Sequence, residues 1–71
     1  MKTYFIIERK QSKNFNGMQL NFKGYAMTRN SFTNLQEGAK RFESKEAAEK
    51  YAKKWFNDFI DEISVISYVI Y

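Results

Sequence analysis

Three acidic residues near the end of the chain are the ones whose spacing could support catalysis. Asp58, Asp61 and Glu62 form a short cluster, and on a helix Asp58 and Glu62 would share one face. Paired carboxylates can transfer protons in general acid–base catalysis or bind Mg²⁺. The solvated end of an ordinary helix has the same composition, and we favour this second interpretation.

The residue types that the chain lacks exclude most other catalytic chemistry. It has no histidine and no cysteine, so it cannot form Ser–His or Cys–His pairs, disulfides or the usual zinc sites. Its three glycines are isolated in the sequence and do not form a phosphate-binding loop. We therefore predict that the protein is not an enzyme and has no catalytic residue, bound metal or cofactor.

Basic residues are concentrated in the first part of the chain. Residues 1–42 carry eight basic and two acidic side chains, whereas residues 43–71 carry four lysines and six acidic side chains. A basic segment suggests nucleic acid or an acidic protein as a partner. A charge of this size is also consistent with solubility alone. The candidate binding cations are Arg9, Lys10, Lys13, Lys23 and Arg29.

Two groups of side chains could supply a binding surface. Lys23, Tyr25 and Arg29 fall on one predicted face of a strand, where cations next to an aromatic ring could contact phosphates and stack on a base. The alternative is a solvated sheet face with a cation–π contact. Trp55 is the other candidate, because an exposed tryptophan is a typical anchor of a protein interface. The alternative for Trp55 is that it belongs to a broad aromatic core.

A β-hairpin is the first element that must position these residues. Residues 3–9 are β-branched and aromatic, and residues 18–29 alternate between apolar and polar, which is typical of strands. In the second strand Leu20, Phe22, Gly24 and Ala26 would form the half-buried face. The Asn16–Gly17 pair between the strands favours a turn, because both residue types tolerate positive φ.

A helix and a last strand follow. Apolar residues recur from Ala47 to Ile60 with helical spacing, and Ser44 is a suitable N-cap. Residues 63–71 are β-branched and apolar on both faces, which predicts an inner strand. Residues 30–42 are either a short third strand or a loop. The fold class is therefore α+β: a small, mainly antiparallel sheet of three or four strands in the order ββ(β)αβ, with one amphipathic helix packed on one face.

The start of the predicted helix resembles that of a class of small proteins. Residues 42–52 have a Phe-x-Ser-x-Glu-x-Ala pattern, which resembles small ββ(β)αβ proteins of phages and mobile elements. It is also similar to the helix of the AP2-like arm-binding domain of phage integrases, whose sheet enters DNA. This chain departs from the integrase pattern in having a further strand after its helix and no catalytic domain. The resemblance thus implies a phage-like ββ(β)αβ protein more than a DNA-binding role.

These observations together predict a small binding protein. We expect a single domain, residues 1–71, in the cytoplasm of a bacterial host cell, because the longest apolar run has four residues and a membrane span needs about 20. The preferred hypothesis is a phage or mobile-element protein that modulates or inhibits a host protein by direct contact, in the manner of anti-CRISPR proteins. The alternative is a nucleic-acid-binding protein that uses a basic sheet face. A homodimer is also consistent with the sequence, because so short a chain has room for only a small core.

Overall fold

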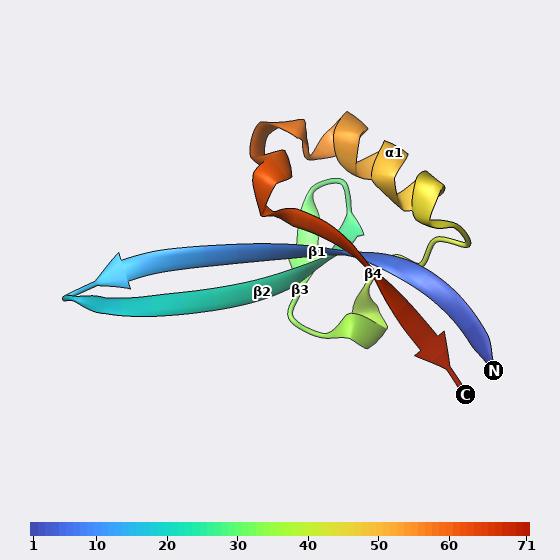
Figure 1. Ribbon diagram of the computed structural model, residues 1–71, viewed down its shortest axis with the longest axis horizontal. Helices are drawn as coiled ribbons and strands as arrows, with labels where there is room; N and C mark the ends of the chain where they lie inside the picture. The colour runs from blue at the N-terminus through green and yellow to red at the C-terminus, as the bar shows by residue number, and fades with distance from the viewer.

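The computed structural model describes residues 1–71 and contains a four-stranded antiparallel sheet with one α-helix packed on it (Figure 1). The predicted α+β class and the ββ(β)αβ order are confirmed. Residues 30–42 form both a short strand and a turn. The elements in chain order are β1 (Lys2–Phe15), β2 (Met18–Thr28), β3 (Ser31–Thr33), the 3₁₀ helix η1 (Gln36–Gly38), α1 (Lys45–Trp55), the 3₁₀ helix η2 (Asn57–Glu62) and β4 (Ile63–Ile70).

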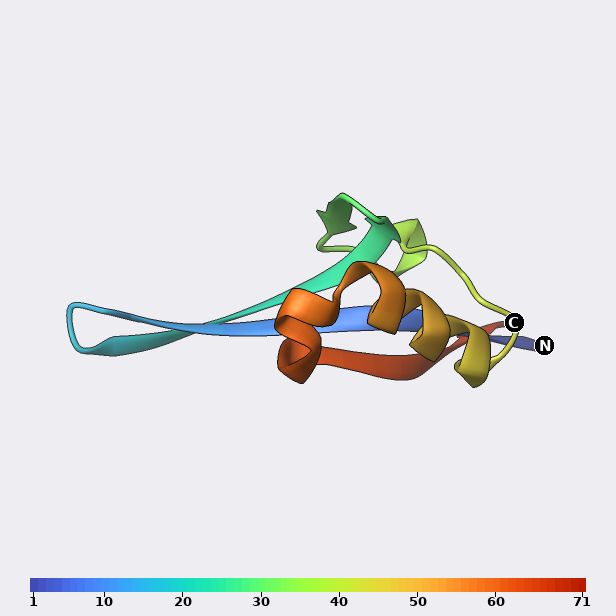
Figure 2. The same ribbon diagram turned by 90° about the horizontal axis from the view of Figure 1, so that it is seen from above.

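The strands lie in the order β3-β2-β1-β4, which places the last strand at an edge of the sheet. The prediction that this segment is an inner strand is therefore wrong. The apolar residues of β4 have another explanation. The elements α1 and η2 cover one face of the sheet, and the segment around η1 lies on the other (Figure 2). An apolar pattern on both sides of a strand shows that both faces are covered, not that a strand lies on each side.

The β1–β2 hairpin is longer than the sequence pattern indicated. Its strands pair from Glu8–Tyr25 to Phe15–Met18 and are joined by the predicted two-residue turn. Asn16 and Gly17 both have positive φ, at 51° and 78°, as a type I′ turn requires. The outer part of the hairpin, residues 10–23, extends well beyond the helix in Figures 1 and 2. We call this projecting ribbon the arm.

Replacing Gly17 by alanine is expected to destabilise the arm by about 1 kcal/mol, because a Cβ atom disfavours positive φ. No atom lies within 4 Å of the position that this Cβ would occupy, so the effect comes from the backbone alone. Amide hydrogen exchange in residues 10–23 should become faster while the global unfolding midpoint stays nearly unchanged. Asn14→Ala on the same ribbon is the control, and equal exchange rates in both variants would contradict the prediction.

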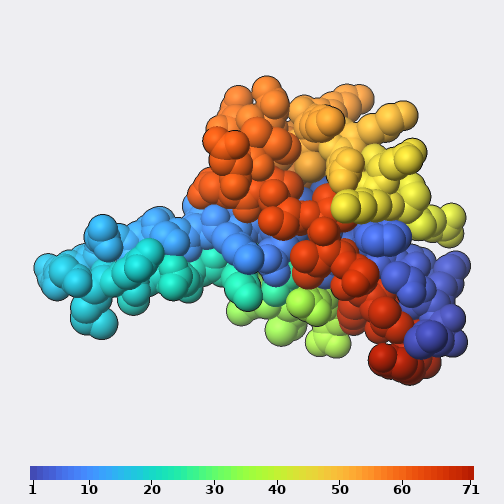
Figure 3. Space-filling view, viewed as in Figure 1, coloured from blue at the N-terminus to red at the C-terminus, as the bar shows by residue number.

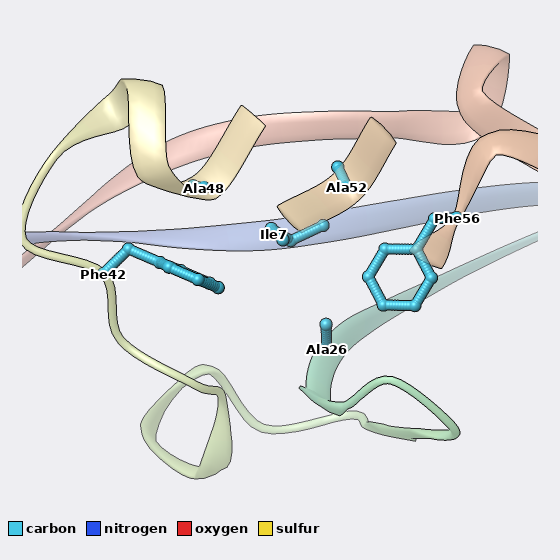
Figure 4. Close-up of a cluster of buried hydrophobic side chains, with 6 residues drawn as sticks. All are labelled: Ile7, Ala26, Phe42, Ala48, Ala52 and Phe56. Carbon is cyan, nitrogen blue, oxygen red and sulfur yellow. The ribbon is translucent and has the colours of Figure 1, made fainter. Parts of the chain in front are cut away.

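The main core lies between the helix and the sheet (Figure 4). Ser44 caps the helix as predicted, its Oγ accepting a hydrogen bond of 3.1 Å from the Ala47 amide. The helix places Ala48 and Ala52 against the sheet, and such small side chains let it approach closely. The remaining members of this core are Ile7 of β1, Ala26 of β2, Phe42 of the loop before the helix and Phe56, which follows the helix.

The apolar stripe that predicted the helix continues beyond the end of the helix. The α-helix stops at Trp55, Phe56 leaves helical geometry with φ −119° and ψ 23°, and residues 57–62 form a 3₁₀ segment that is interrupted at Phe59. This turn points Phe56 into the core, where only 1% of its surface is exposed. The periodicity thus identified Ala48, Ala52 and Phe56 as buried, although the backbone at Phe56 is not α-helical. It also included Ala47 and Trp55, which are exposed.

Candidate functional site

The arm has two chemically different faces, because cross-strand partners in a ribbon point to the same side. Its apolar face consists of four side chains around the turn, accompanied by Gln11 and Lys13. Its polar face consists of three amides, one hydroxyl and two lysines. The apolar face is Phe15, Met18, Leu20 and Phe22; the polar face is Lys10, Ser12, Asn14, Gln19, Asn21 and Lys23.

The apolar face of the arm is largely exposed to solvent. Phe15 and Met18 expose 65% and 63% of their surface, and Phe22 exposes 49%. The alternating pattern predicts that Leu20 and Phe22 are half-buried with Ala26, and this prediction is wrong for this part of the strand. Ala26 lies beneath the helix, whereas the arm continues past the end of the layer that would cover it (Figure 3).

The polar face of the arm brings two lysines together. Lys10 and Lys23 are directly opposite each other in the β1–β2 register, an arrangement that destabilises a strand pair through charge repulsion. Residues 10–23 contain a third lysine, Lys13, and no carboxylate. The nearest compensating charge is the buried Glu8, whose Oε1 lies 3.7 Å from the Lys10 ammonium.

Tyr25 does not lie on an exposed face, so the predicted base-stacking surface is not formed. Only 7% of its surface is exposed, and it packs with Ile6 and Ala39. Its hydroxyl accepts a hydrogen bond of 3.3 Å from the Gln36 amide group. The segment around η1 folds back over this face of the sheet. Residues 30–42 lack a clear periodicity, so this cover could not be predicted from their pattern.

Arg29 and Trp55 come together at a different place from Lys23. The Arg29 guanidinium lies over the Trp55 ring, 4.9 Å from its centre, and the Lys54 ammonium lies 5.0 Å from the same ring. Trp55 is 38% exposed, so part of its surface is free for contact with a partner. A register shift between Ala26 and Thr28 ends the regular alternation of β2, which is why Arg29 does not continue the face that carries Lys23.

Arg9 stabilises the fold through contacts with other elements, and its side chain is only partly accessible to solvent. Its guanidinium lies 3.8 Å from the centre of the Phe59 ring and donates a hydrogen bond of 3.1 Å to the Glu62 carboxylate. It also lies 5.7 Å from the Phe32 ring. Arg9 thereby joins β1 to β3 and η2, and it is not available as a free cation for a ligand.

The acidic cluster does not form a site. Glu62 is paired with Arg9, while Asp58 and Asp61 are exposed on a 3₁₀ segment. No group of three or more acidic, histidine or cysteine side chains could hold a metal ion. The two hollows on the surface, one between α1 and β4 and one between η1 and Tyr68, are both open to solvent.

The helices are short, and none has the length and apolar character required to span a bilayer. No protein-family model, curated protein or solved structure was found to match the chain. The arm carries four of the exposed large apolar side chains, Phe15, Met18, Leu20 and Phe22, and the signal for this apolar face was present in the sequence. Apolar residues alternate from Met18 to Phe22, but alternation alone does not show whether another layer covers them.

Proposed function

We propose that the protein is a non-enzymatic binding module that docks on a partner protein through the apolar face of the arm. The observation that carries this proposal is the exposure of Phe15, Met18 and Phe22 on one side of a projecting ribbon. Contiguous apolar surface of this kind is characteristic of interaction sites in soluble proteins. Aromatic and methionine side chains are also enriched at the centres of protein interfaces.

The charge of the arm favours a partner with acidic groups beside an apolar groove. Lys13 lies on the apolar face and Lys10 and Lys23 lie on the polar face of the same ribbon, and residues 10–23 contain no carboxylate. Complementary charges at the rim of an interface accelerate association and select the partner. The expected partner is a bacterial host protein that a phage or mobile-element protein modulates or inhibits by occupying its groove.

Nucleic-acid binding is the second candidate function, and the polar face of the arm favours it. Lys10 and Lys23 repel each other across the ribbon, but their pairing would bring two cations to a phosphate backbone. Asn and Gln side chains follow them on the same face toward the turn, and a two-stranded ribbon is narrow enough to enter the major groove of DNA. Tyr25, which the sequence pattern places on this face as a base-stacking residue, is buried and takes no part in this arrangement.

Two double variants, one for each face of the arm, separate these functions. Leu20→Thr with Phe22→Thr removes apolar surface and keeps residues that favour strands, while Lys10→Gln with Lys23→Gln removes the charge of the other face. Wild-type protein serves as bait in a bacterial lysate, and each captured protein is then purified and titrated against all three forms. The same three forms are titrated with random-sequence duplex DNA at about 50 and 200 mM salt.

A protein partner of the apolar face should bind the threonine variant at least about thirtyfold more weakly than it binds the wild type. This factor corresponds to the loss of about 2 kcal/mol of binding free energy, as expected when an interface anchor is removed. The glutamine variant should retain most of the affinity. Equal affinity of the wild type and the threonine variant for every captured protein would contradict the proposal. Salt-sensitive binding to DNA that only the glutamine variant loses would establish the second function instead.

A further inference from the structure

The outer edge of β4 carries backbone groups that have no partner within the chain. The amide and carbonyl of Phe5 both bond to Phe42, so they point away from β4, and the Phe5–Ser67 pair is one that exchanges no hydrogen bonds. Because such pairs alternate along an antiparallel ladder, the amides of Val65, Ser67 and Val69 also point outward. The register of β1 with β4, from Lys2–Ile70 to Arg9–Ile63, is regular throughout, so this alternation is unbroken.

The other edges of the sheet have features that discourage strand pairing. On the opposite side, β3 has only three residues and joins β2 through a register shift, and the arm carries lysines. β4 has none of these protections, since its eight residues include no charge, proline or glycine. A long, flat and uncharged edge readily pairs with a further strand.

The free edge and the composition of β4 favour pairing with another strand. Figure 3 shows residues 63–71, in red, crossing the front of the molecule with nothing over them. Only ten of the 71 residues are buried, and a chain of this size often completes its core by association.

We infer that a second copy of this chain pairs with β4, so that two sheets join into one continuous eight-stranded sheet across a two-fold axis. The three outward residues, Val65, Ser67 and Val69, are symmetric about Ser67. An antiparallel copy with Ser67 opposite Ser67 therefore satisfies all three amides of each chain at once. The edge contains no charge, so nothing in it opposes its own copy.

The surface beside β4 also suits a second copy. The groove between the helix and β4 has a volume of about 350 Å³ and is lined by apolar residues of η2 and β4. Lys45, Glu49 and Lys53 line its helix side, so both signs of charge are available to a symmetric neighbour. Pairing through the same surface on both subunits closes after two copies and does not continue into a fibre. This dimer uses a different surface from the arm and does not depend on the proposed function.

The test compares the mass in solution of the wild type with two variants of Ser67. Ser67→Pro removes one outward amide and places a ring toward the second copy. Every bond to β1 is kept because the Ser67 amide points away from β1, and proline is tolerated on an edge strand. Ser67→Ala is the matched control and retains the amide. The mass is measured by sedimentation equilibrium at about 100 μM protein, because modest interfaces have dissociation constants in the micromolar range. The wild type and the alanine variant should give twice the chain mass of 8.5 kDa. The proline variant should give the single-chain mass with unchanged circular dichroism.

Two further measurements keep the inference testable if the proline variant does not fold. Ser67→Lys leaves the backbone intact and places like charges opposite each other, so it too should shift the mass to that of one chain. Hydrogen exchange should show protected amides at Val65, Ser67 and Val69 in the wild type, since these groups have no intramolecular partner. A wild type with the mass of one chain and rapid exchange at these three amides would overturn the inference.

Discussion

Phe56→Ala should lower the free energy of unfolding by about 3–5 kcal/mol, as expected when a fully buried phenylalanine is truncated. The ring is 1% exposed and lies 5.1 Å from the centre of the Phe32 ring and 5.5 Å from that of Phe59. It also contacts Tyr51 at 5.9 Å. One side chain therefore joins the helix, the 3₁₀ segment and the short third strand, and its loss removes packing from all of them.

Urea unfolding followed by circular dichroism measures this loss, and Trp55→Ala is the matched control. Trp55 precedes Phe56 in the chain, but it is 38% exposed and packs against cations at the surface. Its truncation should cost less than about 1 kcal/mol, within the range of an exposed cation–π contact. If the tryptophan variant were the less stable of the two, the assignment of the core would be wrong.

Arg9→Ala should lower the free energy of unfolding by about 1–3 kcal/mol, through loss of packing and of a charge-assisted hydrogen bond. The guanidinium stacks 3.8 Å from the centre of the Phe59 ring and bonds to Glu62 at 3.1 Å. Truncation leaves the Glu62 carboxylate, whose side chain is 35% exposed, without its partner. Because Arg9 links distant parts of the chain, we expect an effect on stability rather than on binding by the arm.

A double-mutant cycle with Glu62→Ala separates the ion pair from the stacking contact. Arg9→Ala and Glu62→Ala should be non-additive, and the part of the loss that remains in the Glu62→Ala background belongs to the contact with Phe59. Arg29→Ala is the control, since this arginine also stacks on an aromatic ring but lies at an exposed turn. Additive effects of Arg9 and Glu62 would show that their hydrogen bond contributes nothing to stability.

Local features of the chain were predicted accurately because they depend on neighbouring residues. Asn16 and Gly17 adopt the positive φ that a tight turn requires, and Ser44 caps the helix through its side chain. The spacing of Ala48, Ala52 and Phe56 identified the face that is buried. Each of these signals lies within a few residues of the feature that it specifies.

The candidate site was predicted less well, because it depends on which layers cover the sheet. Lys10, Lys13 and Lys23 lie on the arm as the predicted hairpin implied. Tyr25 was placed on an exposed face, but the segment around η1 covers it. Periodicity separates the two faces of a strand, and it does not reveal which segment packs on either of them.

The sequence by itself determined the type and order of the elements, the turn, the helix cap and the absence of the side chains needed for most catalytic chemistry. Those properties follow from residue identity and short-range spacing. Only the tertiary structure decided that the hairpin projects past the helix, that Arg9 is engaged with Phe59 and that β4 lies at an edge. These outcomes depend on where the helix ends and where loops return, which are set by contacts between residues far apart in the chain.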